Sequence, residues 1–356
     1  MRLHGIDTLR GLAVVAVVFY HFFVLLGIDN SISSYIHSLG LLGVPLFFII
    51  SGYLIYMSVD NNIKKKGKKE GLKNYFLHRA FRILPAYYFN LIIVLFMASF
   101  IIGSDFLYSS SFSRQLLSHF TLTSYFTHKA VGLGINGAYW TLNIELLWYL
   151  IAPIFILFIR DIKIILSISI LSLIYLTALD YGLLDSLFNI NSQMPSYRLQ
   201  LFYINSQIMG EINYFLVGIL IYKYTINTPL KTILPSIISI LILISIFVGV
   251  NGYFGITKSF LTLHIFTISI TTLIFILLYK TKIPKISILN WLGEISYSIY
   301  LWHMPILYIM NKTDILRYLS LTKTVFIFIF ILLFISSMSY YLIEKGGYRL
   351  RERIGK

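Results

Sequence analysis

The first apolar segment of membrane length, residues 6–27, carries three ionisable side chains, Asp7, Arg10 and His21. At about 100° per residue, Arg10 and His21 fall within about 20° of each other on a helix, and Asp7 lies about 60° away on the same flank. A rise of about 1.5 Å per residue separates Arg10 from His21 by roughly 16 Å, so Arg10 is expected at one membrane boundary and His21 inside the hydrocarbon. An ionisable group at that depth is costly, and it predicts a functional site.

The composition places this segment in a multi-spanning membrane protein. Of the 356 residues, 58% are hydrophobic and only 12% are charged, which is unusual for a soluble domain. Cysteine is absent, which excludes disulfides, iron–sulfur clusters, cysteine zinc sites and thiol nucleophiles. The formal net charge of +15 is explained by basic loops that meet anionic lipid, so we expect no nucleic-acid partner. We also expect no metal and no permanently bound cofactor.

Apolar runs separated by polar loops predict an all-α, polytopic bundle of about ten transmembrane helices. With a cytoplasmic N-terminus, most of the 29 lysine and arginine residues fall in cytoplasmic loops, which places both termini inside. The loop at 61–82, with its lysine run from Lys64 to Lys73, contributes most to this bias. The predicted spans are 9–27, 40–59, 83–103, 141–159, 163–181, 209–223, 232–250, 260–279, 289–310 and 324–343.

The domain organisation is predicted to be simple. We expect one membrane domain over residues 1–343 and a short basic cytoplasmic tail over 344–356. No loop exceeds about forty residues, and no low-complexity linker is visible. The sequence also lacks an evident internal repeat, which weakens the case for a transporter built from repeats.

Other polar groups are expected at the depth of His21, about 9 Å below the outer surface. Helical rise places Glu145 about 7 Å and His303 about 10 Å from that surface. Each could simply satisfy a partner between helices, but their shared depth favours a common site. Three further residues are candidates for that layer, although structural roles are favoured for them: Glu211, Asn213 and His264.

Two more motifs allow two interpretations each. Ser51 and Gly52, near the middle of the second span, let a ligand or another backbone approach, although helix packing alone also explains them. Arg79 and Arg82 stand one turn apart at the cytoplasmic start of the third span, just before Pro85. Arginine forks suit phosphate, but arginine at this boundary is also an ordinary topology signal.

Together these motifs resemble the acyltransferase-3 family of integral membrane O-acyltransferases. Asp7-Thr-Leu-Arg10, followed by the spacing from Arg10 to His21, is similar to that family's Arg/Lys-x10-His motif. The likeness continues in chain order through residues 43–55, 79–85, 140–149 and 296–305. Two departures are visible: Leu146 stands where the family's fourth-helix motif usually has a second carboxylate, and the extracytoplasmic esterase-like domain of some relatives is not expected here.

The resemblance implies a ten-helix enzyme of a bacterial-type cytoplasmic membrane. Its donor would be cytoplasmic acetyl-CoA, or another acyl-CoA, and its acceptor a hydroxyl of an extracytoplasmic glycan such as lipopolysaccharide O-antigen, capsule or another surface polysaccharide. A separate extracytoplasmic partner that finishes the reaction is left open. Two groups of residues are assigned on this basis. Donor binding is expected at Asp7, Arg10, Arg79 and Arg82, and positions near the substrate at Ser51, Gly52, Trp140 and Asn143.

A sugar hydroxyl is a poor nucleophile near neutral pH, so acyl transfer needs a base, and histidine suits that role. We therefore expect catalysis by His21, together with Glu145 and His303. Direct transfer and a covalent acyl-enzyme relay both fit this arrangement. Two other classes are open. A transporter or flippase of a glycan lipid would not need the fixed Arg10–His21 spacing, and a scaffold or sensor would tolerate replacement of His21 or Glu145.

Overall fold

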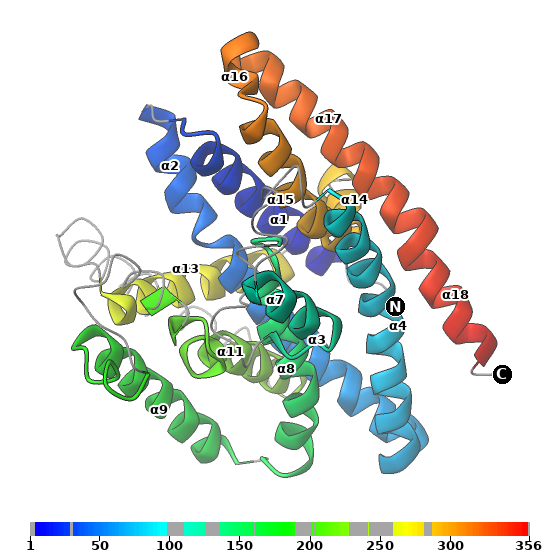
Figure 1. The fold of residues 1–356 in the computed structure, drawn as a ribbon. Coiled ribbons are helices and arrows are strands. Elements are labelled where there is room, and N and C mark those ends of the chain that lie inside the picture. Colours follow the sequence, from blue (N-terminus) through cyan, green and yellow to red (C-terminus); the bar gives the residue numbers. More distant parts are fainter. Residues whose placement is uncertain are drawn as a thin grey trace. The chain divides into compact units, whose positions relative to one another are not determined.

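The protein is helical throughout the part of the chain that the computed structural model describes (Figure 1). The described residues are 4–28, 31–97, 110–124, 135–159, 161–188, 201–202, 204–227, 241, 259–280 and 287–354. No strand occurs within these ranges, in agreement with the all-α prediction. By length and apolar composition, 7 helices among these residues could cross a membrane. The chain is thus a multi-helical integral membrane protein.

The predicted spans overlap helices wherever the structure describes them. The span predicted at 232–250 lies almost wholly outside the described residues. The overlapping helices are α1 (His4–Leu25), α3 (Gly43–Lys66), α4 (Lys68–Phe96), α8 (Tyr139–Leu157), α9 (Ile162–Asp180), α11 (Ile208–Asn227), α13 (Phe260–Lys280), α14 (Ser287–Glu294), α15 (Ser296–Lys312) and α17 (Leu321–Ser339). Among the described residues, the apolar patterns missed four short helices, α2 (Ser31–Gly40), α7 (Ser110–Phe120), α16 (Ile315–Tyr318) and α18 (Lys345–Ile354).

The prediction of a long polar loop at 61–82 is wrong. α3 continues to Lys66 and α4 begins at Lys68, so only Gly67 separates two long helices. Gly67 has φ 74°, a left-handed conformation that glycine adopts without steric cost, and the helix breaks there. Hydropathy missed these turns because lysine and glutamate form helices well although they are polar.

The span predicted at 289–310 is also wrong as a single helix, because α14 and α15 are separated at Ile295. α14 lies against α1, and two glycines let their backbones touch. A Cβ on Gly293 would collide with the carbonyl of Asp7, and one on Gly11 with the carbonyl of Leu289. This packing fixes the part of α1 that carries Arg10.

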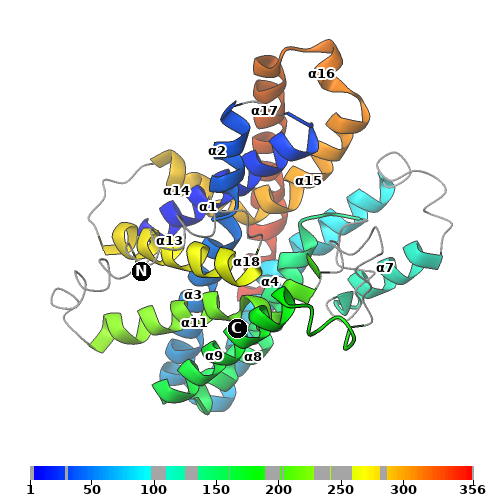
Figure 2. The same ribbon diagram turned by 90° about the vertical axis from the view of Figure 1, so that its left-hand side faces the viewer.

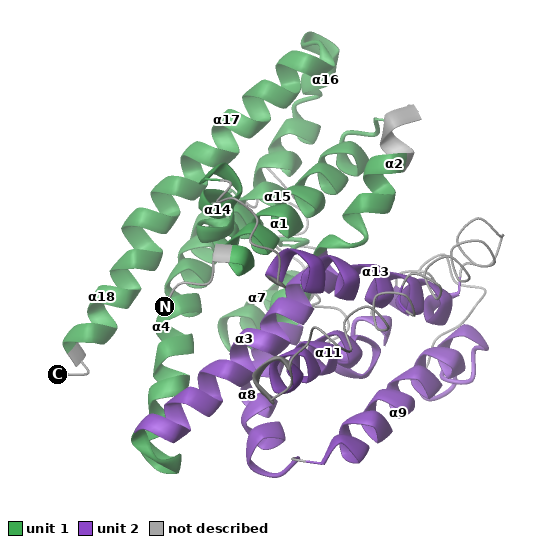
Figure 3. Ribbon diagram, turned by 180° about the vertical axis from the view of Figure 1, so that it is seen from behind, with its two compact units in different colours: residues 1–43, 66–143, 285–356 green, residues 44–65, 144–284 purple. Residues whose placement is uncertain are grey.

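The helices group into two compact units, each made of discontinuous segments (Figure 3). Unit 1 comprises residues 1–43, 66–143 and 285–356, and unit 2 comprises 44–65 and 144–284. In unit 1, α1 packs on α2, α14 and α15, and α15 packs on α17. α17 continues through a π-helical turn (Tyr340–Glu344) into α18 (Lys345–Ile354). The π-helical turn and α18 lie beside α4 (Figures 1 and 2). In unit 2, α9 packs on α11 and α13.

α13 of unit 2 begins on a carboxylate from α9. Asp180 accepts hydrogen bonds from the backbone amides of Phe260 (2.6 Å) and Leu261 (3.0 Å) and from the hydroxyl of Ser259 (2.6 Å). The first amides of a helix have no partner within it, and a carboxylate there also interacts favourably with the helix dipole. Asp180 therefore joins two helices of this unit through a cap supplied from outside α13.

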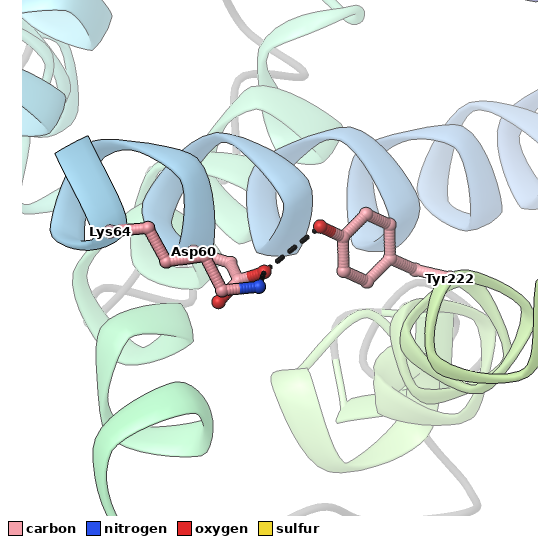
Figure 4. A network of polar contacts seen from close by, with 3 residues as sticks. All are labelled: Asp60, Lys64 and Tyr222. Carbon is pink, nitrogen blue, oxygen red and sulfur yellow. Dashed lines mark hydrogen bonds and ion pairs between the residues drawn. The ribbon is translucent and has the colours of Figure 1, made fainter. Parts of the chain in front are cut away.

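The lysine run lies at exposed helix ends. Lys64 Nζ is 2.7 Å from a carboxylate oxygen of Asp60, which also accepts a hydrogen bond from the Tyr222 hydroxyl at 3.0 Å (Figure 4). An exposed ion pair of this kind contributes little, about 0–1 kcal/mol. Exposed lysines beside a membrane-length helix suit contact with anionic lipid.

We therefore predict that the lysines act in membrane insertion and lipid binding, and not in turnover. Replacing Lys64, Lys65, Lys66, Lys68, Lys69 and Lys73 together with glutamine should leave the turnover of correctly inserted protein nearly unchanged. The comparison is made per milligram of purified protein whose orientation has been checked by protease accessibility. Complete loss of activity with normal insertion would contradict the prediction.

Candidate active site

Two of the three predicted catalytic residues meet in unit 1. His303 Nε2 of α15 lies 3.3 Å from His21 Nδ1 of α1, and the ring centroids are 5.1 Å apart. His303 is fully buried, whereas His21 is only partly buried. The His21 ring is therefore more accessible than the His303 ring.

Backbone carbonyls determine the tautomers of this pair. His303 Nδ1 lies 2.8 Å from the carbonyl of Tyr300, and His21 Nδ1 lies 3.0 Å from the carbonyl of Val17. A carbonyl only accepts hydrogen bonds, so both Nδ1 atoms carry hydrogen. Neutral His303 then presents an unprotonated Nε2, which accepts from the Nδ1–H of His21. As a result, the Nε2 of neutral His21 carries a lone pair that can take a proton.

The helix that carries His303 contains a proline two residues later. Pro305 has no N–H, so the carbonyl of Leu301 loses its usual partner within α15. Two fully buried amides replace that partner: Asn90 Nδ2 donates to Leu301 O at 3.2 Å and Asn136 Nδ2 at 3.0 Å. An unpaired buried carbonyl would be costly, so these two hydrogen bonds stabilise the position of α15 near His303.

Further bonds complete this buried network. Asn90 Oδ1 accepts from the Tyr139 hydroxyl at 2.7 Å and from Asn136 Nδ2 at 3.1 Å. Asn136 Oδ1 accepts from the backbone amide of Ala138 at 3.0 Å, at the start of α8. Sequence reasoning missed both asparagines, because Asn136 lies in a connecting segment and Asn90 in an apolar span. Pro305 was a usable signal, since it leaves a carbonyl to be satisfied.

The side of α15 next to Trp302 borders an apolar cavity of about 390 Å³ between α4 and α17. Its lining includes Phe89, Trp302, Ile306 and Ile335, and it presents no polar surface. A cavity without hydrogen-bonding groups suits hydrocarbon and not a sugar.

Glu145, the third predicted catalytic residue, lies in unit 2. Ser51 of α3 donates a hydrogen bond to its Oε1 at 2.9 Å, so these two predicted residues do lie together. Gly52 serves close packing, because a Cβ there would collide with the backbone of Phe215 in α11. Trp148, one turn after Glu145, stacks on the Phe215 ring with centroids 4.6 Å apart. Packing thus accounts for Gly52, while Ser51 has a polar partner in Glu145.

The other polar candidates of unit 2 are buried. Asn213 of α11 accepts from Ser169 at 2.6 Å and donates to Ser172 at 3.0 Å, which joins α11 to α9 and supports the structural role expected for it. Glu211 is also buried. The His264 ring lies against Tyr214, with centroids 4.4 Å apart. None of these contacts joins Glu211 or His264 to Ser51 or Glu145.

Two predicted substrate-side residues, Trp140 and Asn143, lie in the first turns of α8 within unit 1. Asn143 Oδ1 accepts a hydrogen bond from Ser124 at 2.7 Å, and both residues are buried. This bond ties α8 to the residues that follow α7. Asn143 therefore has a structural partner, and Trp140 is partly exposed beside it.

Two of the predicted donor-binding arginines act on a buried carboxylate of unit 1 that sequence reasoning missed. Arg82 of α4 and Arg10 of α1 both interact electrostatically with Glu344, which is 3% exposed. Arg79 lies over the Tyr75 ring, 5.8 Å from its centroid. Arg351 of α18, also missed, donates to Asn74 of α4 at 2.6 Å. The four arginines supply a cationic cluster suited to phosphate.

Comparison with known proteins identifies the family of this chain. A family model described as Acyltransferase domain matches residues 3–342. The chain therefore belongs to the acyltransferase-3 family of acyltransferase enzymes. No solved structure matches the chain.

Two similar proteins carry the name OatA. The peptidoglycan O-acetyltransferase OatA of Listeria monocytogenes is 28% identical over 328 residues, which cover 85% of this chain and 49% of that protein. The O-acetyltransferase OatA of Staphylococcus aureus is 27% identical over 342 residues, with 87% and 51% covered. The chain thus spans about half the length of these relatives. A putative acetyltransferase of Acidianus two-tailed virus is 27% identical over 302 residues, with 84% and 82% covered.

Proposed function

We propose that this protein is a membrane O-acetyltransferase that moves an acetyl group from cytoplasmic acetyl-CoA to a hydroxyl of an extracytoplasmic glycan. The observation that carries the proposal is the histidine pair, in which His303 and the Val17 carbonyl leave Nε2 of the accessible His21 as a proton acceptor. Family membership supplies the reaction class. The acceptor follows from the Listeria relative, whose name specifies peptidoglycan, so we infer a cell-wall or other surface glycan.

In the proposed reaction, His21 Nε2 takes the proton of the glycan hydroxyl while its oxygen attacks the thioester carbonyl. The carbon–sulfur bond then breaks, and the sulfur leaves as CoA thiol with the proton that the imidazolium returns. His303 Nε2 accepts from the Nδ1–H of His21 throughout, which holds the ring and stabilises the imidazolium. Glu145 remains a predicted participant on the basis of its expected depth.

The proposed topology has about ten transmembrane helices and both termini in the cytoplasm. It places the arginine cluster at the cytoplasmic face and His21 further toward the outer face. The roughly 16 Å of helix between Arg10 and His21 can be spanned by the pantetheine arm of CoA. The nucleotide would thus bind inside while the acetyl group reaches the acceptor.

The direct test uses purified protein with acetyl-CoA labelled in the acetyl group and a surface glycan. We expect release of CoA thiol together with a gain of one acetyl mass on a defined sugar. A transporter or flippase would show neither. Mass analysis of surface polysaccharides from cells with and without the protein then identifies the acceptor.

The arginines should affect donor binding more than chemistry. We predict that Arg82→Ala raises KM for acetyl-CoA by about tenfold or more and changes the dependence on glycan concentration little, because a phosphate clamp contributes mainly to binding. Arg10→Ala should behave in the same way. Initial rates measured with each substrate varied in turn decide the matter, and an effect confined to the glycan would remove Arg82 from the donor site.

A further inference from the structure

We propose that Glu344 is a positioning residue of the donor site, which orients Arg82 and Arg10 toward the phosphates of the acyl donor. This inference rests on the proposed function and deepens it. Glu344 matches none of the motifs described above, and sequence reasoning places it at the first position of a basic tail. In the structure it is instead one of the most deeply buried charged residues of unit 1.

The surroundings of Glu344 come from four helical segments of unit 1. Ser298, fully buried in α15, donates its hydroxyl hydrogen to Glu344 Oε1. The charges of Arg82 in α4 and Arg10 in α1 act on the same carboxylate. Burying a carboxylate is costly, and the positive charges of the two arginines offset part of that cost. Glu344 thus connects both donor-site arginines to the helix that carries His303.

Helix geometry explains how Glu344 comes to lie there. The buried face of α17 includes Phe328, Leu332 and Ser336, a spacing of four residues that continues to Tyr340 and Glu344. In an α-helix this spacing drifts by about 40° at each step. The wider π-helical turn over Tyr340–Glu344 offsets part of the drift, and such turns occur often at functional sites. Glu344 therefore stays on the buried face.

A glycine brings the same helix against the arginine. Gly347 lies three residues after Glu344, and a Cβ there would collide with the carbonyl of Phe81, the neighbour of Arg82. α18 and α4 therefore approach backbone to backbone at this point. The close approach keeps the carboxylate beside the arginine.

The guanidinium group makes such an orienting role possible. Arginine has five N–H donors in one plane, so one edge can bind a carboxylate while the other edge binds a phosphate. Two effects of removing the carboxylate oppose each other: the site becomes more positive, which attracts phosphate, and the arginines lose their fixed orientation. We expect the loss of orientation to dominate, because bidentate phosphate binding depends on geometry as well as on charge.

The test compares Glu344→Gln with Glu352→Gln, which removes the same charge from an exposed position of α18. Binding of CoA to the purified full chain is measured by titration calorimetry, apart from any turnover. We expect Glu344→Gln to weaken CoA binding by about tenfold to a hundredfold. This factor corresponds to the loss of one charge-assisted hydrogen bond. KM for acetyl-CoA should rise in parallel while kcat at saturating donor changes less. Glu352→Gln should match the wild type.

A double-mutant cycle separates orientation from mere stability. If Glu344 acts through Arg82, then Glu344→Gln should weaken CoA binding far less in an Arg82→Ala background than in the wild type. Ser298→Ala removes only the hydroxyl that donates to the Glu344 carboxylate, and it should shift CoA binding in the same direction. It replaces Glu344→Gln in the test if that variant does not fold.

The outcomes distinguish the two proposals. Failure of the wild type to bind CoA would overturn the proposed function itself. If the wild type binds CoA normally and Glu344→Gln binds it equally well or more tightly, the positioning role alone is overturned. Tighter binding would mean that Glu344 competes with phosphate for the arginines. Additive effects of Glu344→Gln and Arg82→Ala would also overturn it.

Discussion

His21→Ala is expected to abolish acyl transfer while the protein still folds, inserts and binds acyl-CoA. In the proposed reaction, His21 Nε2 takes the proton of the acceptor hydroxyl, and removal of a general base typically lowers the rate by ~10²–10⁴-fold. The measurement is the initial rate of acetylation of the glycan by purified protein, with CoA binding determined on the same preparation. Arg10→Ala should fail differently, by weakening CoA binding.

His37→Ala is the matched control, because His37 is a partly buried histidine of the same unit whose ring lies 5.7 Å from that of Tyr20 and not against His303. We expect it to retain wild-type activity. Near-normal acetylation by His21→Ala would show that His21 is structural. Loss of CoA binding equal to that of Arg10→Ala would place His21 in the donor site instead.

Asn90→Leu is expected to lower the free energy of unfolding by about 2–4 kcal/mol, because it leaves the buried Tyr139 hydroxyl without its acceptor and removes one donor from the Leu301 carbonyl. The loss should appear as a lower midpoint of thermal unfolding in detergent. Asn62→Leu is the control, since Asn62 is partly exposed and donates a hydrogen bond to the Ser58 carbonyl one turn earlier in its own helix.

The proline provides a sharper test of the same network. Pro305→Ala restores an N–H that can bond to the Leu301 carbonyl within α15. We therefore expect Pro305→Ala to recover part of the stability that Asn90→Leu loses. Recovery of none of it would show that the Leu301 carbonyl is not what the two asparagines stabilise.

Several features of this protein follow from short stretches of sequence. Helical periodicity and rise predict that Arg10 and His21 lie on one face at different depths, and apolar runs located nearly every long helix that the structure describes. Helix positions can be predicted in this way because hydrocarbon forces the backbone into helices. Family motifs then added the reaction class, which the match over residues 3–342 confirms.

Tertiary structure alone decided which of these residues meet. His303 reaches His21 across 282 positions of sequence, and Glu344 reaches Ser298 across 46. Asn136 lies outside any helix, and Glu344 follows a long apolar span at the start of a basic segment, so hydropathy marks neither residue as buried. Asn136 is identified because the buried Leu301 carbonyl must have a partner, and Glu344 because a buried carboxylate must have partners. Those partners come from distant segments that only packing brings together.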